Sequence, residues 1–175
     1  MKPLHADART VTGSIRLSRV GWLRFPHYEL TAEGRLVAEL ARDSSIWIFF
    51  GRGRRIRLAD GTEWRVKAAT TGRLIVPVIK SAAGTVAFSG PLHSKRSYGI
   101  TGKDFAYEVV PHGRVGLRGA GVWGMRRHEA EVAVIDVQRR AIDAAEPIPI
   151  AAALMAFTVL AHGTPGDADL MPTRD

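Results

Sequence analysis

Basic side chains between residues 52 and 67 form the densest group in the sequence that could do chemistry. The segment alternates around a turn, so two paired strands would place Arg55, Arg57, Arg65 and Lys67 on one face, opposed only by Glu63. Each arginine offers a planar fork that binds phosphate oxygens in a bidentate manner. We therefore predict an anion-binding or headgroup-binding site at these four residues. The alternative is an ordinary solvated face, partly neutralised by Glu63.

A short turn would position these cations. Ala59-Asp60-Gly61 fits a three-residue hairpin loop with the glycine in the left-handed conformation. Pairing around this loop sets Ile56 opposite Trp64 and Arg54 opposite Val66. The sequence therefore predicts a hairpin with an apolar inner side and a basic outer side.

The same Ala-x-Gly pattern recurs twice, 27 residues earlier and 23 residues later. Read as a three-residue loop, the earlier copy would pair Leu30 with Leu36, and the later copy would bring Val78 opposite Phe88. Three such turns at similar spacing predict a meander of strands with a weak internal repeat.

A helix is predicted over residues 150–162. Its first twelve residues contain one polar side chain, Thr158, and no charge, while Pro147, Pro149 and Gly163 mark its limits. Such a helix would be roughly 20 Å long, which is too short to cross a bilayer. Because it is apolar on every side, it must be covered by protein.

The rest of the sequence is typical of short strands. We expect about ten to twelve of them, including Val20–Phe25 and Ile46–Phe50, and this number favours a sandwich or a barrel. Only a closed barrel offers a lone apolar helix a place to sit and also removes exposed sheet edges. We therefore predict a mainly β fold over residues 9–163, a closed antiparallel β-barrel of about twelve strands enclosing the C-terminal helix. Residues 1–8 and 164–175 are expected to be flexible.

The order of these elements resembles the tubby C-terminal-like superfamily, which includes tubby domains, phospholipid scramblases and LURP-one-related proteins. The resemblance rests on the strand pairs of residues 28–40 and 98–110, and on a last strand that runs into the proline-flanked apolar helix. It would cover residues 10–163 and implies an antiparallel barrel threaded by a hydrophobic helix, with binding rather than catalysis as the role. Tubby domains bind phosphoinositide headgroups through basic residues outside the barrel, and those positions are not matched here. Scramblases are palmitoylated on cysteines, and this chain has none, so scramblase activity is not implied.

Composition points to two classes of partner. The net charge of +8 and the pI of about 10.6 favour anionic membrane or nucleic acid. Arginine outnumbers lysine 20 to 5 and asparagine is absent, a bias that a GC-rich bacterial genome also produces, so the charge is either functional or compositional. The single glutamine, Gln138, leaves adenine readout poorly supplied, which makes nucleic acid the less favoured partner. The first residues lack the apolar core of a signal peptide, so we expect a cytoplasmic protein, peripheral at the membrane.

Other chemistry finds little support in the sequence. The Gly119-Ala-Gly-Val-Trp-Gly124 stretch spells a dinucleotide fingerprint, but an alternating β run follows it where a helix is required. The six histidines lack metal-ligand spacing, and the absence of cysteine removes disulfides, thiolate metal sites and cysteine nucleophiles. We predict no catalytic residues, no metal and no cofactor.

These observations favour a non-enzymatic binding module for anionic lipid headgroups, whose oligomeric state the residues do not indicate. The alternative is a nucleic-acid or protein-interaction module that uses the same basic face. A small-ligand carrier or an enzyme working at a barrel mouth would need a pocket lined by converging polar groups.

Overall fold

The computed structural model describes six stretches of the chain, residues 9–21, 27–42, 54–71, 74–91, 97–113 and 121–160. They contain twelve strands and one helix. The strands are β1 (Thr10–Val20), β2 (His27–Ala32), β3 (Arg35–Arg42), β4 (Arg54–Leu58), β5 (Glu63–Thr71), β6 (Leu74–Ser81), β7 (Gly84–Pro91), β8 (Tyr98–Gly102), β9 (Ala106–Pro111), β10 (Val122–Arg127), β11 (Ala130–Asp136) and β12 (Ala141–Pro149), and the helix is α1 (Ile150–Leu160).

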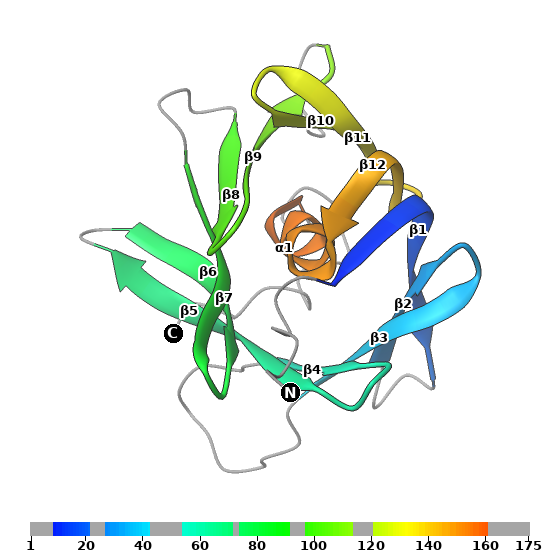
Figure 1. Cartoon of the computed structure of the whole chain (residues 1–175), viewed down its shortest axis with the longest axis vertical. Coiled ribbons are helices and arrows are strands. Elements are labelled where there is room, and N and C mark those ends of the chain that lie inside the picture. The colour runs from blue at the N-terminus through cyan, green and yellow to red at the C-terminus, as the bar shows by residue number, and fades with distance from the viewer. Residues whose placement is uncertain are drawn as a thin grey trace, which may run out of the picture.

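The strands close into a barrel around the helix. Each strand pairs antiparallel with its neighbours in sequence, and β1 pairs with β12 to complete the ring. Figure 1 looks into this ring and shows α1 inside it. The predicted fold, a closed antiparallel barrel of twelve strands with a C-terminal helix, is confirmed. The expected strand at Ile46–Phe50, most of the one at Val20–Phe25, and both chain ends expected to be flexible lie outside the described residues.

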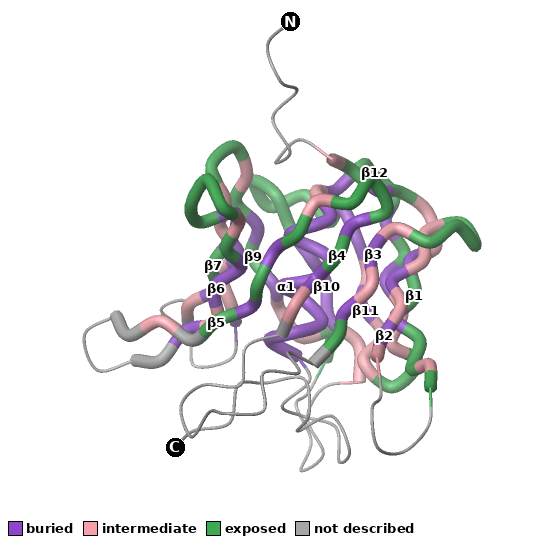
Figure 2. The backbone as a smooth tube through the Cα atoms, turned by 90° about the horizontal axis from the view of Figure 1, so that it is seen from below, coloured by how far each residue is buried: buried purple, intermediate pink, exposed green. Residues whose placement is uncertain are grey.

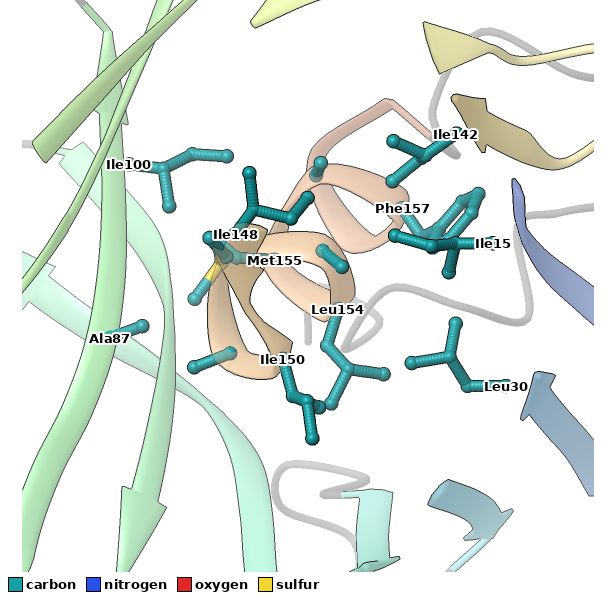
Figure 3. Packing of buried hydrophobic residues seen from close by; sticks show 14 of the residues in the cluster. Ile15, Leu30, Ala87, Ile100, Ile142, Ile148, Ile150, Leu154, Met155 and Phe157 are labelled. Carbon is teal, nitrogen blue, oxygen red and sulfur yellow. The ribbon is translucent and has the colours of Figure 1, made fainter. Parts of the chain in front are cut away.

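The helix fills the barrel because no side of it can face water. All of its residues from Ile150 to Leu160 are buried. Figure 3 shows Leu154, Met155 and Phe157 leaving the helix in different directions, toward different parts of the wall. Its one polar side chain, Thr158, donates its hydroxyl hydrogen to the Leu154 carbonyl oxygen at 2.8 Å, so no polar group is stranded there. Within the described stretches, no helix combines the length and the apolar character that crossing a membrane requires.

Every second side chain along the strands of the barrel points inward, toward this helix. Ile15, Leu30, Ile56, Ile100 and Ile142 come from five different strands, and each is completely buried. Polar and charged residues alternate with such positions along the strands, as the change between buried and exposed colours along the tube in Figure 2 shows. The core is therefore a helix at the centre and a ring of inward side chains around it.

The first hairpin differs from the prediction. Glu33 and Gly34, both with positive φ (49° and 74°), form a two-residue turn rather than part of a three-residue loop. Leu30 lies opposite Ala38 instead of Leu36, because a register shift follows the turn. This bulge restores the apolar phase of β3 and leaves Leu36 outside, with 43% of its surface exposed.

The third hairpin repeats this arrangement. Val78 lies opposite Phe88, as predicted, but a register shift separates that pair from a tight turn at Ala82-Ala83. The pair lies on the outer side of the wall, since the neighbouring pair of Ile79 and Ala87 is completely buried inside.

Candidate anion-binding face

The hairpin of β4 and β5 carries the four predicted cations. Its observed register pairs Ile56 with Trp64 and Arg54 with Val66, so the predicted pairing is confirmed. Ile56, Trp64 and Val66 are at most 3% exposed and belong to the core. Because side chains alternate between the two sides of a strand, burial of this set places Arg55 and the other three cations on the outside.

The turn between the two strands holds this register. The Leu58 amide donates to the Thr62 carbonyl oxygen at 2.8 Å, and Gly61 takes the left-handed conformation with φ of 85°. Asp60 Oδ1 accepts the Thr62 amide hydrogen at 3.0 Å and a hydrogen bond from Arg9 at 2.7 Å. The hydrogen bond from the Thr62 amide is the main cause of a lowered pKa for Asp60, and Arg9 adds to it. The turn that spaces the cations is thus fixed by a carboxylate that stays charged.

Three cations lie side by side across three strands. Arg55 of β4 is opposite Arg65 of β5, and Arg65 is opposite Lys80 of β6. We call Arg55, Arg65 and Lys80 the cationic row. Its ends meet Ala41 of β3 and Thr85 of β7, so no carboxylate stands in register with it. Like charges directly opposite each other on a sheet are destabilising, because their side chains start only about 5 Å apart.

Two of the three cations in the row are accessible, while Arg55 already has an interaction partner. Arg65 and Lys80 are exposed, and Arg55 is half-buried. Among the described residues, Arg65 and Lys80 form no ion pair. Lys67, next to Arg65 in the outward phase of β5, is also exposed and forms no ion pair with a described residue. A doubly charged anion placed over the row would relieve the repulsion within it.

Arg57 belongs to a different electrostatic environment. It lies opposite Glu39 on one side and Glu63 on the other, and its guanidinium is 3.6 Å from a Glu63 carboxylate oxygen. Glu39 is itself opposite Glu29, so the cross-strand line through Arg57 is acidic. Of the four predicted site residues, Arg57 is therefore the one that fits the alternative of a solvated, neutralised face.

Lys80 was missed by sequence reasoning. The pairing of β5 with β6 had to be known before Lys80 could be placed beside Arg65. A signal was present, because the predicted pairing of Val78 with Phe88 already put Lys80 in the outward phase of the same strand.

The last glycine of the fingerprint has a structural explanation, while Gly119 and Ala120 lie outside the described residues. Gly124 lies within strand β10, where no helix begins. The side chains of His112 and Glu131 cover it, with 2.6 Å between His112 Nε2 and Glu131 Oε2. A Cβ atom on Gly124 would lie 2.7 Å from His112 Nε2 and closer still to the Glu131 carboxylate. The glycine therefore makes room for two side chains rather than for a pyrophosphate. Across the described stretches of the chain, His, Asp and Glu nowhere gather into a metal-binding group.

A groove of about 760 Å³ opens at the end of the barrel where α1 begins. Its floor includes Val11, Leu58 and Ile150, and three of its four charged lining residues form hydrogen bonds within the protein. Arg9 pairs with Asp60, and Glu33 Oε1 accepts the Ser14 amide hydrogen at 2.6 Å. The residues that line the groove are Arg9, Thr10, Val11, Ala32, Glu33, Arg35, Leu36, Val37, Leu58, Ala59, Asp60 and Ile150. Arg9, Asp60 and Glu33 are thus already used by the protein, so the polar groups of this barrel mouth do not converge on a ligand.

Comparison with known proteins adds no further constraint. The sequence matches no protein-family model and no curated protein, and the fold matches no solved structure.

Proposed function

We propose that this chain is a non-enzymatic binding module of the tubby-like kind, which contacts anionic lipid headgroups at the cytoplasmic surface of a membrane. The observation that carries the proposal is the cationic row. Three strands of a rigid wall bring Arg55, Arg65 and Lys80 into register, and no carboxylate stands in line with them. With Lys67 beside Arg65, three exposed cations face outward: Arg65, Lys67 and Lys80. Arg55 is half-buried and already has an interaction partner.

Charge density alone supports this use. A basic residue near an anionic membrane surface contributes about 1 kcal/mol to binding, so the three exposed cations together contribute about 3 kcal/mol. The face is also suited to phosphate oxygens, since the exposed Arg65 supplies a bidentate fork on a strand that is already paired on both sides.

Flotation with phosphatidylcholine vesicles that contain phosphatidylserine tests the proposal. The double variant Arg65→Glu/Lys80→Glu should bind at least about thirty-fold more weakly, because two contacts of about 1 kcal/mol each are lost and replaced by repulsion. The matched control is Arg16→Glu/Arg19→Glu, which changes the net charge equally on exposed positions of β1, across the barrel. Equal loss of binding in the two double variants, or no flotation of the wild-type protein, would refute the proposal.

The alternative partner of the same face is the phosphate backbone of nucleic acid. In that case duplex DNA should compete with vesicles, and the logarithm of its binding constant should fall steeply with the logarithm of salt concentration. A row of exposed aromatic residues for stacking bases is not found among the described residues, where Phe88 is the one large aromatic side chain that is exposed. This observation favours the lipid surface over nucleic acid.

A further inference from the structure

Phe88 is one of two large apolar side chains that remain exposed on the described part of the wall. Among the described residues only Leu36 and Phe88 are large hydrophobic side chains with high exposure, at 43% and 45%. Phe88 lies in the middle of β7, between Ala87 and Ser89, which face inward and are 0% and 1% exposed. The exposure therefore follows from its outward phase in a strand paired on both sides, and not from a frayed end.

The pairing of strands places Phe88 beside the basic face. Val78 of β6 is opposite both Lys67 of β5 and Phe88 of β7, so the three residues form one line across the wall. Neighbouring strands are about 4.8 Å apart, which puts Lys67 and Phe88 about 10 Å from each other. Lys80, two residues from Val78 on the same side of β6, is a diagonal neighbour of Phe88 at about 7–8 Å.

We propose that Phe88 is the apolar anchor of the membrane-docking face, and that it inserts into the boundary between headgroups and acyl chains while Lys67 and Lys80, both on the β5–β6 side of it, contact the headgroups. This inference rests on the proposed function and makes it more specific. It names an intact anionic bilayer as the partner, rather than a soluble phosphate compound, and it orients the barrel with β5, β6 and β7 toward the membrane.

The chemistry of the three side chains fits such a boundary. An aromatic ring gains by leaving water for the acyl region, and lysine ammonium groups reach headgroup phosphates while their methylene chains stay beside apolar surface. A soluble phosphate has no acyl region, so it would use the cations and leave Phe88 in water. A lipid surface thus accounts both for the exposure of Phe88 and for the cations beside it, whereas a free anion accounts only for the cations.

The absence of cysteine from the sequence permits a direct test. Phe88→Cys and Leu36→Cys can each be labelled at a single site with a polarity-sensitive fluorophore. With phosphatidylserine vesicles, the probe at position 88 should shift its emission to the blue and be quenched by brominated acyl chains. The probe at position 36 should do neither, although the original side chains are almost equally exposed.

Unlabelled variants separate the anchor from the charges. Phe88→Ala should weaken vesicle binding about ten-fold, because roughly half of a phenylalanine side chain no longer leaves water. Its dependence on salt should equal that of the wild type, whereas Arg65→Glu/Lys80→Glu should reduce that dependence. Leu36→Ala should bind as the wild type does, and circular dichroism should show that both alanine variants are folded.

The outcomes distinguish this inference from the function on which it rests. If the wild type floats with vesicles and the charge variants do not, but Phe88→Ala floats normally and the probe at position 88 stays in water, the anchor is refuted and headgroup binding stands. The anchor is also refuted if Phe88→Ala weakens binding to vesicles and to a soluble inositol phosphate equally. If the wild type does not float at all, the proposed function fails first.

Discussion

Truncation of Leu154 to alanine should remove a large part of the stability of this barrel. Leu154 lies in α1, is 1% exposed and is surrounded by a wall that buries the helix on every side. Removing its branched end costs the transfer free energy of the lost groups and leaves a cavity, and such changes cost about 2–5 kcal/mol. A continuous ring of paired strands cannot contract onto the cavity, so we expect about 4–5 kcal/mol, against a total stability of about 5–15 kcal/mol.

Urea unfolding followed by circular dichroism measures this loss as a shift of the midpoint at constant slope. Leu36→Ala is the matched control, since it removes the same atoms from a side chain that is 43% exposed, and it should change stability by no more than about 0.5 kcal/mol. Leu154→Asp should fail to fold, because an unpaired charge inside the barrel costs several kcal/mol more. A soluble Leu154→Asp variant with the wild-type midpoint, or equal midpoints for the two alanine variants, would show that the helix does not fill the barrel.

Two further predictions concern the wall. Gly102→Ala should cost about 1–3 kcal/mol in a thermal melt, because the new Cβ would collide with the Phe105 ring and lie 2.8 Å from the Val86 carbonyl oxygen. Gly90→Ala, whose new Cβ would meet no atom within 4 Å, should be nearly neutral. Equal losses of stability in the two variants would contradict this geometry. Burial raises the pKa of Tyr107 above its ordinary value of 10.0, so the folded state holds the phenolic proton more tightly than the unfolded chain. The stability that the protonated Tyr107 contributes is complete below pH 10.0 and is lost as pH rises through the higher pKa of the folded state. Above about pH 10, the melting temperature of Tyr107→Phe should therefore fall less with pH than that of the wild type. Parallel profiles of melting temperature against pH would refute this.

Local patterns were sufficient to predict the β4–β5 hairpin. Ile56, Trp64 and Val66 alternate with cations, and Asp60-Gly61 supplies both a left-handed position and a side chain that caps the turn, so every signal agrees on one register. The apolar helix was equally predictable, because an unbroken apolar face on all sides leaves only the interior as its place.

The first hairpin shows why other registers were not predictable. A three-residue loop and a two-residue turn followed by a bulge both keep the apolar phase of the two strands, and they differ only in whether Leu36 lies in the core. Hydrophobicity favours the core for Leu36, and the wrong loop followed from that preference. The choice depends on the backbone of the turn, where Glu33 accepts a positive φ and its carboxylate binds the Ser14 amide of β1.

The full candidate site could not be predicted from the sequence for a related reason. Arg55 and Arg65 face each other within one hairpin, so their proximity is local. Lys80 and Phe88 join them only through the pairing of β5 with β6 and of β6 with β7, and each register shift changes which residues meet. Phe88 was also hard to assign, because a phenylalanine side chain favours the protein interior, whereas its position in the strand places it on the outside.

The position of α1 after all twelve strands has a consequence for biosynthesis. As the polypeptide leaves the ribosome, every segment of the wall emerges before the segment that will occupy its interior, and β12, which closes the ring against β1, emerges immediately before it. Until residue 160 is available, the nascent chain exposes unpaired strand edges and the inward isoleucines and leucines, the surfaces from which aggregation starts. The ring can therefore close around the helix only late in synthesis, and the yield of folded protein in cells should depend on chaperones that shield these surfaces during translation.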